Sequence, residues 1–462
     1  MREPKPPAPG PWAPYSPDEK APWNVQRVVH LHRRAAFAAT WAEVRRDLAD
    51  GPAASIDRLL AGKSRSQGVP AAFEKAALGL ADAAVVSPEP AGLKAWWVYR
   101  MLFGPDPLGE RLTLVWHNHF ATSNDKVSDL AAMRRQNELF RRHARAPFAD
   151  LLNAALRDPA LLAFLDAPAN RKGHPNENLA RELLELFTLG IGHYGEPDVR
   201  ESARALTGWS VGRSGFRNVP ALHDDGVKTI LGRKGRWTGK DLLKLVLDHP
   251  ATAGRLASRV CELLMGERAT DSAAVRALAD GLRKNDLDVG WAVGTVLRSR
   301  AFNARANLGT QVRGPVEHLV GAARALELFD DPPSTLALAD WSARLGQDLF
   351  YPPNVGGWPG GRAWLTTSAV IGRANYARAL AGGELSAGGR PLDALGLARR
   401  HGRGRSLDDL VSFYAELVLG SDPGEAWRGR LARAIRPGPK LDADSARRAV
   451  VLLLASPEAQ LA

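Results

Sequence analysis

The amino-acid sequence, 462 residues long, has almost no cysteine and no long apolar run. Its single cysteine, Cys261, excludes a disulfide within the chain and a cysteine-rich metal site. No run of about 18 consecutive apolar residues occurs, so we predict no transmembrane segment. The N-terminal sequence is rich in proline and lacks the apolar core of a secretory signal peptide, and we therefore expect a cytoplasmic location.

Stretches in which β-branched and polar residues alternate are also nearly absent. Apolar residues instead recur at spacings of three and four, which predicts amphipathic helices. We therefore expect a mainly α fold: a large multi-helix domain with long ordered loops and at most short β-strands. Thr40 as N-cap and Glu43 as its capping-box partner predict the start of one helix, and Gly51 predicts its end.

Changes in composition predict the boundaries along the chain. Residues 1–23 are expected to form a proline-rich arm, and residues 24–382 a helical core domain. Residues 383–405 are expected to be a linker or loop, and residues 406–462 C-terminal helices that pack on the core. Within the core, residues 209–237 are rich in glycine and lack a helical period, so short strands or an ordered loop are predicted there.

Basic residues outnumber acidic ones, which gives a formal net charge of +12. An excess of this kind favours an acidic partner in general terms. The basic residues are nevertheless spread among acidic ones, and no basic-aromatic motif of a nucleic-acid reader occurs. The sequence therefore disfavours a nucleic-acid ligand.

Two histidines flank an asparagine inside the apolar run LVWHNHF, residues 114–120. On a helix, side chains two positions apart diverge by about 200°, so His117 and His119 can reach one metal ion only if the helix ends there. The ATSND sequence that follows favours a helix end near Phe120, which would let one or both imidazoles turn inward. The alternative is that one histidine is a core residue with satisfied hydrogen bonds and that Asn118 is a C-cap.

A second group of polar residues lies in the sequence PNENLARELLELF. Asn176 is a candidate helix cap, and Asn178, Glu182 and Glu185 then share one face beside an apolar stripe. Two carboxylates one turn apart at the edge of a core suit a divalent metal or an acid–base pair. The alternative is a solvent-exposed face on which Arg181 pairs with Glu185.

A third group, in HDDGVKT, places His223, Asp224 and Asp225 on a turn that contains glycine, followed by Lys228. Three potential metal ligands lie close together there, and the lysine supplies a cation for an anionic substrate group. The alternative is a structural role, which is commoner for a His-Asp pair on a loop.

A fourth group lies in the proline- and glycine-rich sequence YPPNVGGWPGGRAW. Aromatic faces beside an arginine suit sugar rings, nucleobases or acidic groups, and packing of the loop itself is the alternative. The candidate substrate-binding residues of the whole chain are Asn178, Arg204, Trp209, Asn354, Trp358 and Arg362.

Taken together, these stretches resemble the DUF1800 family, bacterial proteins of unassigned biochemical function. The matching phrases are HLHRRAAFAAT (30–40), LTLVWHNHFATS (112–123), the stretch from Arg157 to Trp209, HDDGVKTILG (223–232) and YPPNVGGWPGGRAWL (351–365). The resemblance implies a largely helical protein, often encoded beside a DUF1501 partner that resembles the sulfatase and alkaline phosphatase superfamily. It also implies export for many members, which contrasts with the lack of a recognisable leader here, and it supplies no catalytic residues.

The leading hypothesis is a metal-dependent enzyme with hydrolase-type chemistry. The metal would activate water or a substrate carbonyl or phosphoryl group. Candidate ligands of a divalent transition metal, Zn, Mn or Fe, are His117, His119, Glu182, His223 and Asp224. Candidate catalytic residues are Glu182, Glu185 and Lys228. No nucleotide cofactor is evident.

The alternative is a non-catalytic binding or assembly protein. In it the same polar residues form a buried network, and a partner such as a DUF1501-like protein provides the function. A third hypothesis is a metal-free hydrolase that uses Glu182 and Glu185 as acid and base. It is weakened because both carboxyls would point the same way from one helix, leaving little room for a substrate bond between them.

Overall fold

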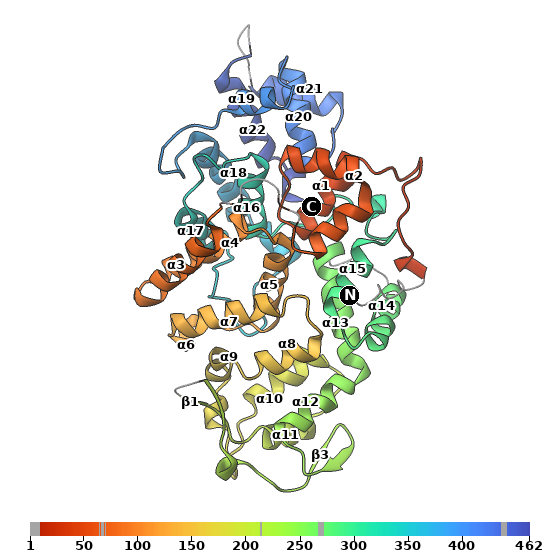
Figure 1. The fold of residues 1–462 in the computed structure, drawn as a ribbon, viewed down its shortest axis with the longest axis vertical. Helices are drawn as coiled ribbons and strands as arrows, with labels where there is room; N and C mark the ends of the chain where they lie inside the picture. Colours follow the sequence, from red (N-terminus) through yellow and green to blue (C-terminus); the bar gives the residue numbers. More distant parts are fainter. Residues whose placement is uncertain are drawn as a thin grey trace.

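The computed structural model describes residues 10–63, 65, 69, 71–212, 215–266, 272–435 and 441–462. Over these residues the chain forms 22 α-helices and two antiparallel two-stranded sheets, which confirms the predicted mainly α fold. Figure 1 shows an elongated molecule with its helices stacked along the long axis. None of the described helices is long and apolar enough to cross a membrane.

The upper half in Figure 1 combines helices from the two ends of the chain. Its N-terminal helices are α1 (Val25–Ala35), α2 (Trp41–Leu60), α3 (Phe73–Val86) and α4 (Ala91–Phe103). Its C-terminal helices are α16 (Pro315–Ala325), α17 (Thr335–Arg344), α18 (Thr367–Gly382), α19 (Ala394–Arg400), α20 (Leu407–Leu419), α21 (Glu425–Ile435) and α22 (Ala443–Ala455). They enclose an upper hydrophobic core, to which Trp97, Leu319 and Tyr376 belong.

The lower half contains the middle of the chain. Its helices are α5 (Pro107–His119), α6 (Asn124–Val127), α7 (Leu130–Arg142), α8 (Phe148–Ala155), α9 (Pro159–Phe164), α10 (Asn178–Glu182), a π-helix (Leu183–Thr188), α11 (Glu196–Ala205), α12 (Gly239–Asp248), α13 (Pro250–Met265), α14 (Ser272–Lys284) and α15 (Val289–Leu297). A lower hydrophobic core, to which Trp116, Phe187 and Val260 belong, lies among them.

Helix α5 connects the two cores. Leu114 packs in the upper core, whereas Leu112 and Trp116 pack in the lower core. The helix ends at His119 with Phe120 as its C-cap, which confirms the predicted helix end. The side chains of α5 near its C-terminus therefore lie at the boundary between the two halves.

Four short strands occupy the stretch from 209 to 237, as predicted. β1 (Trp209–Gly212) pairs with β2 (Gly215–Asn218), and β3 (Lys228–Ile230) pairs with β4 (Arg233–Gly235). The predicted capping box of α2 is also present, with Glu43 N donating to Thr40 Oγ1 over 3.2 Å. Gly51 has φ 82°, which interrupts the helical backbone of α2 where the sequence predicted a helix end.

The described part of the N-terminal arm is anchored to the lower half. Trp12 is fully buried, and its indole N–H donates to the carbonyl of Ala274 over 2.9 Å. Residues 1–9 of the predicted arm lie outside the described residues. At the other boundary, residues 383–405 contain α19 between two loops, because Leu395 and Leu397 bury their side chains in the upper core.

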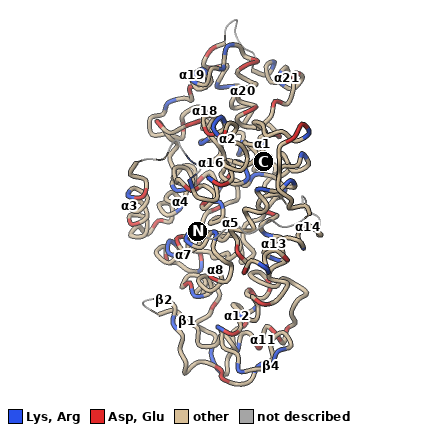
Figure 2. The backbone as a smooth tube through the Cα atoms, turned by 45° about the vertical axis from the view of Figure 1, so that its right-hand side comes forward, with Lys and Arg blue, Asp and Glu red and all other residues tan. Residues whose placement is uncertain are grey.

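Charged residues of both signs are interspersed over the surface. In Figure 2 the Lys and Arg segments alternate with Asp and Glu segments along the whole molecule. Many of them pair, as Arg181 does with Glu196 and Arg428 does with Asp408. The basic positions are therefore spread along the chain among acidic ones, in line with the expectation from the sequence.

Candidate functional site

A cavity of about 590 Å³ opens at the boundary between the upper and lower halves. Its walls come from α5, α13, the first turn of α16 with the segment before it, Gln347 and the loop 356–364. Two of the sequence phrases singled out above meet in it, because Asn118 and His119 line one side and Trp358 and Arg362 line another. The volume is in the usual range of small-molecule sites, which often lie between structural units.

The two histidines of WHNHF point in different directions, as expected for helical neighbours two positions apart. His117 packs against Trp97 and Phe140 in the core, and its Nε2 lies 3.0 Å from Asn137 Nδ2. His119 lines the cavity, and its Nε2 donates to the carbonyl of Phe187 over 3.0 Å. Burial lowers the pKa of both, and with help from Arg259 it lowers that of His119 to about 3. Both imidazoles are therefore neutral at pH 7.

Asn118 holds the loop 356–364 in place. The backbone N–H of Trp358 donates to Asn118 Oδ1 over 2.6 Å. Gly357 adopts φ 88°, and a Cβ on it would lie 2.2 Å from the same oxygen, so only glycine lets the loop approach this closely. The suggestion that Asn118 is a C-cap is wrong, because Phe120 occupies that position. The side-chain oxygen of Asn118 instead accepts a hydrogen bond from Trp358, which lies 240 residues further along the chain.

The inner wall of the cavity carries a buried ion pair. Arg111 is 2% exposed, and its Nε donates to the carbonyl of Arg34 over 3.3 Å while its Nη1 pairs with Glu317 Oε1. Nη2 of Arg111 has no hydrogen-bond partner among the described residues. Burial alone would raise the pKa of the Glu317 carboxyl, but Arg111 and Arg313 outweigh it and hold that pKa below its usual value.

Positive charge accumulates behind this wall. Five arginines are at most 5% exposed and act electrostatically on Glu317 or pair with it: Arg33, Arg34, Arg111, Arg313 and Arg373. Their other hydrogen bonds go mainly to neutral groups, such as the Ala459 carbonyl for Arg33 and the Arg313 carbonyl for Arg373. Burial lowers the pKa of Arg34 to about 9 and that of Arg313 to about 10. One carboxylate thus balances only part of the buried positive charge.

The mouth of the cavity is also cationic. Arg259 faces Glu262 at 3.3 Å, and both side chains are partly exposed. Arg362 is exposed, and its guanidinium has no hydrogen-bond or ion-pair partner in the part of the chain that the structure describes. Asn354 lies outside the cavity wall, where its Oδ1 accepts from Gly356 N over 2.8 Å and shapes the turn.

The predicted carboxylate pair lies on another part of the lower half and does not line the cavity. Helix α10 continues directly into the π-helix, so Glu182 ends the first and Glu185 lies in the second. Glu185 accepts a hydrogen bond from Tyr194 Oη over 2.7 Å, and burial together with Glu185 raises the pKa of Glu182. The suggested Arg181–Glu185 pair is wrong.

The reason is that Arg181 already has other partners. It pairs with Glu177 at 3.0 Å and with Glu196 at 2.8 Å. Asn178 donates through Nδ2 to Asp166 at 3.0 Å. Asn176 accepts from Asn178 N at 3.0 Å, but it is not the N-cap of α10, because Glu177 occupies that position.

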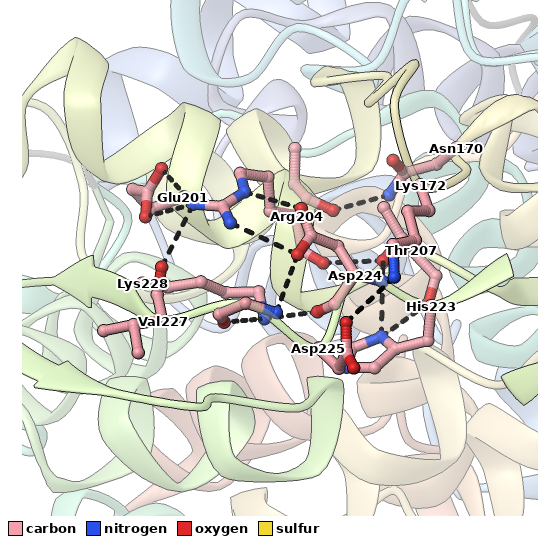
Figure 3. A network of polar contacts seen from close by, with 12 residues as sticks. Asn170, Lys172, Glu201, Arg204, Thr207, His223, Asp224, Asp225, Val227 and Lys228 are labelled. Atoms are coloured by element: carbon pink, nitrogen blue, oxygen red, sulfur yellow. Dashed lines mark hydrogen bonds and ion pairs between the residues drawn. The ribbon is translucent and has the colours of Figure 1, made fainter.

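The HDDGVKT turn forms a closed network, shown in Figure 3. Arg204 donates to Asp224 and to Glu201, each over 2.8 Å, and this contact holds the pKa of Asp224 down at about 2. His223 Nδ1 lies 3.0 Å from the carbonyl of Thr207. Lys228 is buried and donates to the carbonyl of Gly226 over 3.0 Å and to that of Asp224.

Two further candidate residues of this region, Asp225 and Trp209, contact other residues of the protein. Asp225 pairs with Lys172 at 2.9 Å on the surface. Trp209 is 5% exposed and packs edge-on against Phe216. The polar groups of this network bind one another and tie the β3–β4 hairpin to α11.

The metal site predicted from the sequence requires His117 or His119 to lie beside Glu182 and His223. Among the described residues there is no group of three His, Cys, Asp or Glu side chains that could hold a metal ion. His117 and His119 point apart, and the carboxylate of Asp224 is paired with Arg204. These residues therefore do not fit the expected metal.

Comparison with protein families gives one match over almost the whole chain. A family model described as "Protein of unknown function (DUF1800)" matches residues 30–461. The chain belongs to the DUF1800 family. No curated protein and no solved structure gave a significant match to this DUF1800 chain.

Arg111 and Glu317, the buried ion pair of the inner wall, were not among the residues predicted from the sequence. Arg111, Leu114, Val115 and Asn118 all line the cavity from α5. Their spacing of three, four and seven puts them on one face of the helix, so this signal was present in the sequence. Glu317 gave no such signal, because only the fold brings α16 next to α5.

Proposed function

We propose that the DUF1800 protein binds an acidic small molecule in the cavity between its two halves. The observation that supports this function is the set of five buried arginines around the single carboxylate of Glu317. Arg111 would contact the acid group at the inner wall, and Arg259 and Arg362 would attract it at the mouth.

The energetic argument rests on charge balance. Removing a guanidinium from water is costly unless an opposite charge and hydrogen bonds replace the water. The neutral carbonyls around Arg33, Arg313 and Arg373 supply hydrogen bonds but no negative charge. A ligand carboxylate or phosphate would supply it, and the free Nη2 of Arg111 offers a donor for a charge-assisted hydrogen bond.

The geometry supports binding better than the metal-dependent hydrolysis predicted from the sequence. The candidate ligands do not assemble among the described residues. A general base works best with a pKa near the working pH, whereas burial lowers the pKa of His119 to about 3. Glu182, Glu185 and Lys228 do not line the cavity. Assembly with a DUF1501-like partner is a separate proposal that the cavity neither requires nor opposes.

The test compares anions with a neutral molecule of similar shape. We expect benzoate and phenyl phosphate to bind in calorimetry and to raise the Tm, and benzamide to do neither. Binding should weaken as salt screens the exposed arginines, and a chelator should leave it unchanged.

Two variants make this test specific. Arg362→Ala removes an exposed, unpaired cation, so it should weaken anion binding several-fold at an unchanged Tm. Arg111→Gln removes the proposed contact at the inner wall while Glu317 keeps Arg313 as a neighbouring positive charge, and it should abolish binding. Equal binding of benzamide, or no binding of either anion, would refute the proposal.

A further inference from the structure

We infer that the ligand is an organic acid with few or no hydroxyl groups and with an apolar body. This inference rests on the proposed function and narrows its ligand class. A cationic cavity could equally serve acidic sugars, so the choice depends on which polar groups of the wall remain free to bind a ligand.

Most side-chain acceptors in the wall are already in use. The oxygen of Asn118 accepts from Trp358 N over 2.6 Å, and that of Gln347 accepts from Val316 N over 3.1 Å. Because the partner is a backbone N–H in both cases, the orientation of each amide is fixed with its oxygen toward the protein.

Two further polar residues of the wall, Gln311 and Thr310, are committed as donors as well as acceptors. Gln311 accepts from Arg34 and donates to the carbonyl of Glu262. The hydroxyl of Thr310 accepts from Arg34 over 3.2 Å and donates to the carbonyl of Asn307 over 3.0 Å.

The side-chain groups that remain free are mainly donors. Nδ2 of Asn118, Nε2 of Gln347 and Nη2 of Arg111 have no partner among the described residues, and neither has the guanidinium of Arg362. A carboxylate accepts hydrogen bonds and donates none, so it matches this set. A sugar hydroxyl must also donate its proton, and a buried donor without an acceptor costs free energy.

Three acceptors of the wall need separate mention. His119 Nδ1 has no partner, but it has essentially no accessible surface, so a ligand in the cavity does not reach it. Both oxygens of Glu317 already accept a hydrogen bond, one from Arg111 and one from Gly314 N. Glu262 is 48% exposed and can serve only a group at the mouth.

Apolar side chains also line the cavity. Seven of them would face the body of the ligand: Leu114, Val115, Leu263, Val312, Trp358, Pro359 and Trp364. Each hydroxyl placed against them would lose its hydrogen bonds to water without replacement, whereas CH₂ groups would gain by leaving water.

The experiment compares two ring acids of similar size. Cyclohexanecarboxylate and glucuronate both carry a carboxylate on a six-membered ring, and only the second carries ring hydroxyls. We expect cyclohexanecarboxylate to bind the full-length protein at least about tenfold more tightly, a difference of about 1.4 kcal/mol, by calorimetry or ligand-observed NMR. Cyclohexanecarboxamide, which lacks the charge, should not bind measurably.

A matched variant tests the role of the free donors. Gln347→Glu keeps an oxygen for Val316 N but replaces the Nε2 donor with a carboxylate oxygen. It should weaken binding of cyclohexanecarboxylate at least tenfold while the Tm of the unliganded protein changes little.

The outcomes separate the two proposals. If glucuronate binds as tightly as cyclohexanecarboxylate or more tightly, the hydroxyl-poor class is wrong although the acid-binding function stands. If neither acid binds, or if the carboxamide binds equally, the acid-binding function itself is refuted. Unchanged binding in Gln347→Glu would show that the free donors do not select the ligand, and would overturn the argument from them.

Discussion

At the scale of the residue, Asn118 has the clearest role. Its single hydrogen bond to Trp358 N joins WHNHF to the loop that closes the cavity. It is a positioning residue in this respect, because its oxygen acts on the wall and not on the ligand. Asn118, and not either neighbouring histidine, therefore connects the WHNHF segment to the loop of the cavity wall.

We predict that Asn118→Ala loses about 1 kcal/mol of unfolding free energy, since it leaves the Trp358 N–H without its acceptor. The loop should also become more susceptible to protease and to hydrogen exchange around Gly357. Asn118→Asp retains an oxygen acceptor and should recover most of the stability, although its added negative charge should still oppose an acidic ligand. If alanine and aspartate variants lose equal stability, the contact with Trp358 does not hold the loop.

At the scale of the element, the network of Figure 3 is a structural tie. Arg204 on α11 connects Asp224 with Glu201 and thereby fixes the turn that leads into β3. We predict that Arg204→Ala speeds hydrogen exchange in the β3–β4 hairpin several-fold, because the hairpin loses its main attachment to α11. Arg200→Ala, on the same helix but outside this network, is the control and should leave exchange there unchanged.

The same variant separates a structural role of the HDDGVKT turn from a role in ligand binding. Acid binding in the cavity should be the same in Arg204→Ala as in the unaltered protein, because none of the network residues lines the cavity. A loss of ligand binding would mean that the HDDGVKT turn belongs to the functional site after all.

Much of this element scale could be predicted from the sequence. The end of α5, the capping box of α2 and the strands after Trp209 follow from local patterns, and the structure has all three. The π-helix that carries Glu185 could not be predicted, since its shift in hydrogen bonding is a change within an otherwise helical pattern. The hydrogen-bond partners of Asp224 and His223, Arg204 and Thr207, could not be predicted either, because the sequence of a loop does not show which side chains the fold brings next to it.

At the scale of the whole molecule, the cavity results from the path of the chain. The upper core is built largely from α1–α4 and α16–α22. Glu317 of α16 and Arg111 of α5, which pair at the inner wall, are therefore 206 residues apart in the sequence. The spacing of Arg111 and Asn118 on one face of α5 can be recognised in the sequence, but its position against α16 depends on the fold. The cores could be predicted as apolar stripes, whereas the boundary between them could not.

The whole molecule should also be sensitive to mild acid. Burial lowers the pKa of several histidines, and four of them, His30, His117, His119 and His318, are at most 4% exposed and are neutral in the folded protein. In the unfolded chain each would titrate near pH 6.5, so unfolding below that pH takes up protons and becomes easier. The free energy of unfolding should therefore be highest above about pH 7 and fall as the pH drops from 6.5 toward 5.

The size of this loss follows from the number of protons. Each histidine that is protonated only in the unfolded state contributes a slope of about 1.4 kcal/mol per pH unit, so four contribute at most about 5 kcal/mol per unit. Asp158 opposes them, because burial raises its pKa to about 6 and the folded carboxyl takes up a proton first. Denaturant unfolding at pH 7.5 and 5.5 measures the net effect, with His117→Gln as a variant that should reduce the slope by about one proton. A free energy of unfolding that is flat or rises over this range would contradict the neutral, buried state of these histidines.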